Sequence, residues 1–154
     1  MSAHLSSIPP KLQDLLDDFA FISDRTQRQD YLIDLADKFS SVRVTPDIAS
    51  RPYDESHRVP ACESDAFVWA QENADGTLNF RFDVLNPQGL SAMAVCSVLG
   101  EACSGAPLAQ VAAIPSDIVF TLFGKDVSMG KGQGLMGIVN MVTYEARRRL
   151  QAES

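Results

Sequence analysis

The sequence lacks features that mark several common classes of protein. Its three cysteines are an odd number and form no C-x-x-C pair, which argues against a disulfide framework and against an ordinary zinc site. It has no apolar run of about 18 residues or more, so no transmembrane helix is expected. Its first residues lack the basic and apolar regions of a signal peptide, and we therefore expect a cytoplasmic protein.

Positive charge is also scarce. The 154 residues include 13 Lys and Arg against 20 Asp and Glu, which gives a formal net charge of −7. A nucleic-acid-binding protein usually carries a basic surface, so that class is disfavoured. Apolar residues make up 45% of the chain, which is enough for a hydrophobic core. We expect a flexible tail over residues 1–8 and a single domain over residues 9–154.

Helical periodicity dominates the first forty residues. Apolar residues recur at helical spacing over residues 11–23, after two prolines that suit the first turn of a helix. A second helix should follow directly, capped by Asp24 with Gln27 three residues later. These two helices are expected to form an antiparallel pair. Residues 40–56 show no sustained period and are typical of an irregular connection.

The apolar pattern changes to period two at Ala66. Residues 77–84 alternate in the same way, and an Asn-Ala-Asp-Gly turn at residues 73–76 separates the two runs. This predicts a β-hairpin, which needs further support because an isolated hairpin is marginally stable. A third strand is expected around residues 58–59 or in the loop before them. Together, the patterns predict an α+β fold with a small antiparallel sheet and helices packed on one side.

The second half of the chain is expected to be helical. Residues 87–104 are apolar nearly all round, which predicts a core helix with Cys96 and Cys103 buried as small hydrophobes. Residues 128–135, S-M-G-K-G-Q-G-L, are interpreted as a glycine-rich loop that opens a final helix. Such a loop is either a plain helix start or an anion site, although its spacing does not match a P-loop.

The third cysteine, Cys62, follows a proline and precedes the first predicted strand, which places it on a loop. His57 and Arg58 would favour a reactive thiolate, whereas Glu63 and Asp65 would oppose it. Local chemistry therefore leaves two interpretations open, a reactive thiol and a buried structural cysteine.

Three motifs, in this order along residues 9–150, resemble the SufE family of sulfur-acceptor proteins. The first helix I-P-P-K-L-Q-D-L-L-D-D-F-A is similar to the first helix of the family, H-R-V-P-A-C resembles R-V-x-G-C, and S-M-G-K-G-Q-G-L resembles S-P-S-R-x-x-G-L. The chain also departs from the family. Ala61 replaces the usual glycine, Lys131 replaces the usual arginine, and Trp69 lies seven residues after Cys62 instead of five.

The resemblance implies a SufE/IscU-like fold and a sulfur-transfer partner and activator, rather than a stand-alone enzyme. A SufS-like cysteine desulfurase would place a persulfide on the loop cysteine, and an iron–sulfur scaffold complex would receive the sulfur. Neither a metal, a cofactor, a nucleic acid nor a membrane is implied. The residues that match the family motifs assign the acceptor role to Cys62 and partner contacts to Arg58, Glu63, Ser64 and Lys131.

Two other classes of function remain open at this stage. One is a scaffold that binds an iron–sulfur cluster through Cys62, Cys96 and Cys103, although their spacing matches no standard ligand pattern. The other is an interaction module with an acidic surface that binds a partner without sulfur chemistry.

Overall fold

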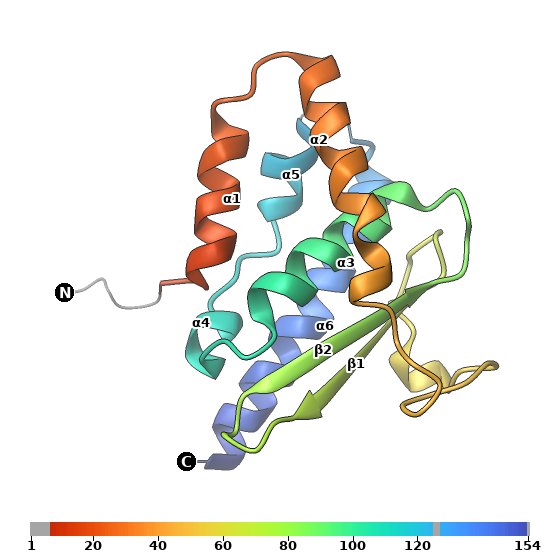
Figure 1. Ribbon diagram of the computed structural model, residues 1–154, viewed down its shortest axis with the longest axis vertical. Helices are drawn as coiled ribbons and strands as arrows, with labels where there is room; N and C mark the ends of the chain where they lie inside the picture. Colours follow the sequence, from red (N-terminus) through yellow and green to blue (C-terminus); the bar gives the residue numbers. More distant parts are fainter. Residues whose placement is uncertain (1–6, 125–126, 154) are drawn as a thin grey trace.

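The computed structural model describes residues 7–124 and 127–153 and shows an α+β fold, which confirms the predicted class (Figure 1). Most of the predicted tail lies outside these residues, and Ile8 already packs against the core. The elements follow in the order α1 (Pro10–Ala20), α2 (Arg25–Asp37), the 3₁₀ turns η1 (Phe39–Ser41) and η2 (Glu55–His57), β1 (Ala66–Glu72), β2 (Leu78–Val84), α3 (Leu90–Cys103), α4 (Leu108–Ala112), α5 (Ile118–Phe123) and α6 (Met129–Glu153).

The two N-terminal helices form as the sequence predicts, but each packs mainly on other helices. The Asp24 carboxylate accepts the backbone N–H of Gln27 at 3.0 Å and caps α2. The Phe19 and Tyr31 rings join α1 to α2 with their centroids 4.6 Å apart. However, α1 packs mainly on α3 and α5, and α2 packs mainly on α3. In Figure 1, α1 and α2 run in opposite directions, as expected of an antiparallel pair, and α5 contacts both helices.

The sheet is the predicted hairpin. Strands β1 and β2 pair antiparallel, with Ala66 opposite Val84 and Glu72 opposite Leu78. Gly76 has a φ of 87° in the turn between them, a conformation that glycine adopts without steric cost. No complete third strand accompanies the hairpin in the described part of the chain. The two candidate segments each make one isolated bridge, from Arg58 to Phe67 on β1 and from Arg43 to Phe82 on β2.

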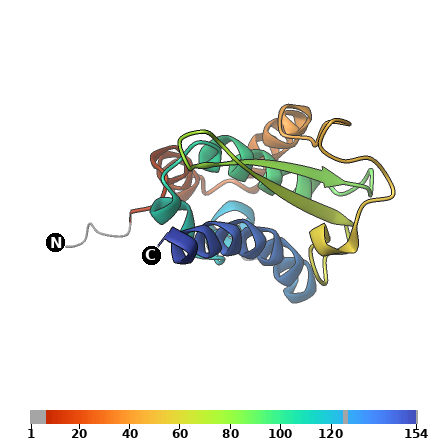
Figure 2. The ribbon, with the colours of Figure 1, turned by 90° about the horizontal axis from the view of Figure 1, so that it is seen from below.

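The two faces of the hairpin are covered by different parts of the chain. Val68, Phe80 and Phe82 face the helical core, where α3 packs against β2 and α6 against β1 (Figure 2). Phe67 and Trp69 face the other way and pack with residues of the irregular connection. That connection therefore supports the hairpin in place of a third strand.

A buried carboxylate fastens this connection to the sheet. Asp83 on β2 is 1% exposed, and it accepts hydrogen bonds from the Tyr53 hydroxyl at 2.6 Å and from Arg51 Nη2 at 3.1 Å. The backbone N–H of Val84 is a third donor, at 2.9 Å. A buried charge is tolerated when it is paired and hydrogen-bonded in this way.

Two helix starts differ from the sequence prediction. Helix α3 begins at Leu90 instead of residue 87, because the Asn86 side chain accepts the N–H of Gln88 at 2.9 Å and holds a turn. The glycine-rich stretch is not a loop, because α6 already starts at Met129. Ser128 Oγ accepts the N–H of Lys131 at 3.2 Å, which places the glycines inside the first turns of the helix. No helix among the described residues is long and apolar enough to cross a membrane.

Candidate functional site

Cys62 lies on a short loop between the Arg58 bridge and the start of β1. The Val59 N–H donates to Ala66 O at 2.8 Å, and the Asp65 N–H donates to Cys62 O at 3.2 Å. Ala61 and Asp65 have φ values of 59° and 53°, so the chain turns sharply on both sides of the thiol. Cys62 is half-buried and packs against the helical core, and the loop therefore holds its sulfur at the boundary between core and solvent.

Glycines on α6 allow this loop to approach the helix closely. A Cβ at Gly134 would lie 3.1 Å from both Ala61 O and Cys62 Cα. A Cβ at Gly137 would lie 2.9 Å from a methyl carbon of Val59. Contacts below 3.4 Å are tighter than those of most real Cβ atoms, so larger residues would displace the loop. The glycine-rich motif thus lets α6 pack closely against the cysteine loop, and it is part of a helix instead of a loop.

The cations next to Cys62 in sequence are directed elsewhere in the structure. Arg58 donates to Glu55 at 2.8 Å and to Asp65 at 2.7 Å, and its guanidinium lies 4.6 Å from the centroid of the Phe67 ring. His57 stacks on Trp69. Both rings belong to the sheet face opposite the helical core, whereas Cys62 packs on the helical side. The idea that these cations assist the thiol therefore has no support in their contacts.

The other predicted partner residues surround the loop. Glu63 is exposed at its tip, and Ser64 is half-buried where it meets the turn before α3. A Cβ at Gly89 would lie 2.9 Å from Ser64 Cβ, which shows how closely the loop and this turn pack. Lys131 is exposed on α6, one turn before the glycine that contacts Cys62. The structure thus brings Lys131 close to the thiol loop, and the partner roles remain predictions.

The remaining two cysteines occupy a different environment. Cys96 and Cys103 lie on α3 with 0% exposure, and all three cysteines are free thiols. Burial raises the pKa of Cys103 to about 12. Burial also raises the pKa of Cys96, with smaller contributions from Cys62 and Asp83. Among the described residues, no three His, Cys, Asp or Glu side chains form a group that could hold a metal ion, so the three cysteines do not make a cluster ligand set.

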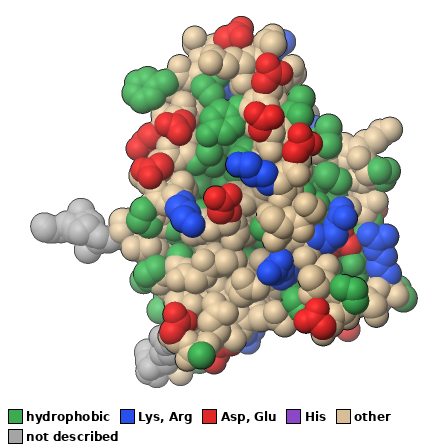
Figure 3. All heavy atoms as spheres, viewed as in Figure 1, with side chains coloured by type: hydrophobic (Ala, Val, Ile, Leu, Met, Phe, Trp, Pro, Cys, Tyr) green, Lys and Arg blue, Asp and Glu red, His purple; other side chains and the backbone are tan. Residues whose placement is uncertain are grey.

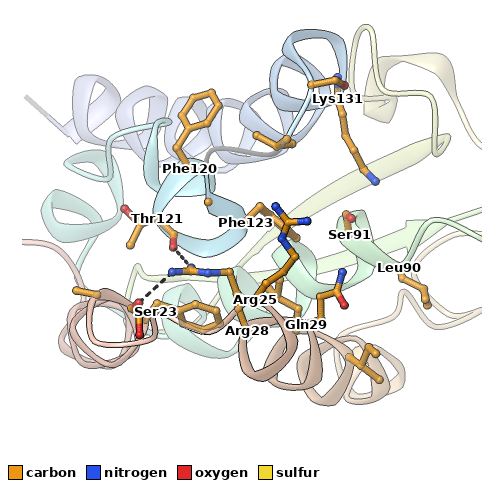
Figure 4. Close-up of a pocket in the computed structure, with 17 residues that line it drawn as sticks. Ser23, Arg25, Arg28, Gln29, Leu90, Ser91, Phe120, Thr121, Phe123 and Lys131 are labelled. Atoms are coloured by element: carbon orange, nitrogen blue, oxygen red, sulfur yellow. Dashed lines mark hydrogen bonds between the residues drawn. The ribbon is translucent and has the colours of Figure 1, made fainter.

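A groove with a volume of about 1080 Å³ lies between the helices, and Lys131 is among the residues that line it (Figure 4). It is lined by the end of α1, by α2 and α5, and by the first turns of α3 and α6. Arg25 and Lys131 point into it from opposite walls. Sequence patterns did not reveal this groove because its lining comes from five elements. The sequence did contain one signal of an exposed apolar surface, because Ile33 is an apolar residue that lies off the apolar face of α2. In the structure, its side chain is 48% exposed.

These features define a small α+β protein that presents one accessible loop thiol and buries its other two. Comparison with known proteins then identifies the family. Residues 13–146 match the SufE model, described as an Fe-S metabolism associated domain. An uncharacterized SufE-like protein of Rhizobium etli is 24% identical over 148 residues, covering 92% of this chain and 93% of the relative.

Structural comparison agrees on the fold. The solution structure of a hypothetical protein from Thermus thermophilus is similar with a TM-score of 0.68 and 23% identity, covering 94% of this chain and 98% of that one. Since the family model spans most of the sequence, the chain belongs to the SufE family and is associated with iron–sulfur metabolism.

Proposed function

We propose that this protein accepts sulfur as a persulfide on Cys62 from a cysteine desulfurase, stimulates that enzyme, and passes the sulfur to iron–sulfur cluster assembly. The observation that carries the proposal is the contrast among its thiols. Cys62 alone is accessible, on the loop that matches the motif of the family, whereas Cys96 and Cys103 are fully buried. The reaction is expected in the cytoplasm, where free thiols such as these three stay reduced.

The transfer needs only a correctly placed thiolate. The Cys62 thiolate attacks the outer sulfur of the persulfide on the desulfurase and forms a new S–S bond. The S–S bond of the donor breaks, and its cysteine leaves as a thiolate that a proton can neutralise. The reaction is an exchange, so no external oxidant or reductant is consumed. Half-burial of Cys62 against the core limits its exposure to oxidants between transfers.

The surroundings of the loop supply the proposed partner contacts. Glu63 and Ser64 flank the thiol directly, and Lys131 presents a positive charge from α6. Arg58 stays a proposed contact, although its guanidinium is already paired with Glu55 and Asp65. A lysine binds as a point charge and lacks the bidentate geometry of the arginine that is usual in the family. An iron–sulfur scaffold complex is the proposed downstream acceptor.

Mass spectrometry after incubation with a cysteine desulfurase and cysteine tests the proposal. We expect a mass increase of one sulfur atom on Cys62, faster turnover of the desulfurase, and loss of both in Cys62→Ser. The matched control is Cys103→Ala, which should keep labelling because that thiol is buried. Labelling of Cys96 or Cys103 in the Cys62→Ser variant would contradict the assignment. An unlabelled native protein would favour an interaction module without sulfur chemistry.

A further inference from the structure

Building on the proposed function, we infer that the groove between the helices is a docking surface for an acidic, amphipathic segment of the desulfurase. The groove carries exposed apolar side chains, the charged residues of its described lining are basic, and two of its walls come from elements that also pack against the thiol loop. Each of these three features is independent of the sulfur chemistry itself.

Apolar side chains are exposed along the rim of the groove. Ile33 of α2 is 48% exposed, Leu90 at the start of α3 is 52% exposed, and Phe120 of α5 is 42% exposed. Three large apolar residues from three helices therefore converge on one hollow. Exposed apolar groups that gather in a concave surface are typical of an interaction site, in contrast to single scattered ones. A helix or strand with apolar side chains on one face would bury all three.

The charge of the groove lining indicates which kind of partner segment it would bind. Its described lining includes Arg25, Arg28 and Lys131 and contains no Asp or Glu. Arg28 is held by backbone carbonyls, including Thr121 O at 2.6 Å and Ile22 O at 2.9 Å. In Figure 4, the side chains of Arg25 and Lys131 point toward the groove from its two walls.

The surroundings of the groove have the opposite charge. The formal charge of the whole chain is −7. In Figure 3, acidic side chains are spread over α1 and α2. The exposed acidic residues of these two helices and the turn between them are Asp14, Asp17, Asp18, Asp24, Asp30, Asp34 and Asp37. An acidic segment is repelled by that surface and attracted by the groove, which fixes where it docks.

Two wall residues of the groove lie next in sequence to, or one helical turn from, glycines that pack against the thiol loop. Leu90 in its wall follows Gly89, which packs against Ser64 of the loop. Lys131 in the opposite wall is one turn from Gly134, which packs against Cys62. One partner can therefore fill the groove and reach the thiol at the same time, and we expect the groove to contribute affinity rather than chemistry.

Substitutions at Ile33 test both the location and the charge of the partner segment. We would measure the affinity of the full-length protein for the cysteine desulfurase of the same organism. Ile33→Glu should weaken binding by about ten-fold or more, since it removes an apolar contact and repels an acidic segment. Ile33→Arg should stay within about three-fold, because attraction offsets the lost contact. The control Tyr144→Glu should stay within about two-fold, since that residue is 58% exposed and outside the groove.

Salt dependence and sulfur transfer complete the test. Raising the salt concentration should weaken binding of the native protein more than binding of Lys131→Ala. At saturating desulfurase, Ile33→Glu should still be labelled on Cys62.

Equal affinity of Ile33→Glu and the native protein would overturn the groove proposal while leaving the sulfur-acceptor role intact. Weaker binding of Ile33→Arg than of Ile33→Glu would also overturn it, as would self-association that depends on Ile33 and excludes the desulfurase. Absence of labelling with groove-dependent binding would refute the acceptor role alone.

Discussion

The cysteine loop and the core helix α3 hold the same functional group under opposite conditions. Cys62 lies on a sharply turned loop at the core boundary, with Ala61 in the left-handed region beside it. Cys96 and Cys103 lie on a regular helix with 0% exposure and raised pKa values. A buried thiol in apolar surroundings stays neutral, and a neutral thiol is a poor nucleophile. The fold thus selects one of the three cysteines by its placement.

The largest effect should appear in the alkylation rates of the three thiols. At pH 8 a thiol with a pKa of about 12 has a thiolate fraction of only about one in ten thousand, and burial also blocks access. We expect iodoacetamide to modify Cys62 at least about 100-fold faster than Cys103 in the folded protein, as measured by peptide mass spectrometry. In denaturant the three rates should converge. Rapid modification of Cys103 under native conditions would show that α3 opens readily.

The contact between α6 and the loop can be broken by adding one methyl group. Overpacking by Gly134→Ala should cost about 1–3 kcal/mol, because its Cβ meets the backbone of Ala61 and Cys62. The control is Gly130→Ala, where a Cβ would meet no atom of the described residues within 4 Å apart from its chain neighbours and the backbone of its own helix, so alanine should be neutral or stabilising by up to about 1 kcal/mol. Urea denaturation of both variants measures the difference. Equal stability of the two would mean that the loop moves aside freely.

Much of this architecture follows from local sequence patterns. The cap at Asp24, the hairpin with its turn at residues 73–76, and the burial of Cys96 and Cys103 depend on neighbouring residues, and all three were predicted. The role of Gly134 was not, because its partner lies about seventy residues earlier on the chain. The groove escaped prediction for the same reason. Local periodicity finds elements, whereas sites formed between elements require knowledge of their packing.

The buried thiols also predict how stability depends on alkaline pH. The folded state keeps Cys103 protonated up to about pH 12, whereas the unfolded chain releases that proton near the ordinary value of 9.0. The stabilisation is therefore complete below about pH 9 and declines as the pH rises toward 12. Between these limits, one such group lowers the free energy of unfolding by about 1.4 kcal/mol for each unit of increasing pH.

Cys103→Ala isolates this contribution. The free energy of unfolding of the variant should fall less steeply than that of the native protein between about pH 9.5 and 10.5, by roughly that slope. Tyr31 and Tyr53 also have raised pKa values, from burial first, but they are present in both proteins and cancel in the comparison. Urea denaturation under reducing conditions at several pH values provides the measurement. Parallel curves would show that Cys103 titrates alike in both states.

The smallest effect concerns Ala61, where the chain departs from the glycine that is usual in the SufE family. Its φ of 59° lies in the left-handed region, which is unfavourable for residues with a Cβ by roughly 1–2 kcal/mol. Ala61→Gly removes this strain but also increases the conformational entropy of the unfolded chain, by roughly 0.5–1 kcal/mol. We therefore expect a net stabilisation of about 0.5–1 kcal/mol in urea denaturation, when the two opposing effects are combined.

The same substitution at Ala113 is the matched control, because Ala113 has a φ of −85° at the end of α4 and carries no such strain. Ala113→Gly should destabilise by up to about 1 kcal/mol, since only the entropic effect remains. If both variants lost stability equally, the loop would not be strained at Ala61. If Ala61→Gly is more stable and still accepts sulfur, the strain at Ala61 is tolerated by the protein and is not needed to keep the Cys62 thiol accessible.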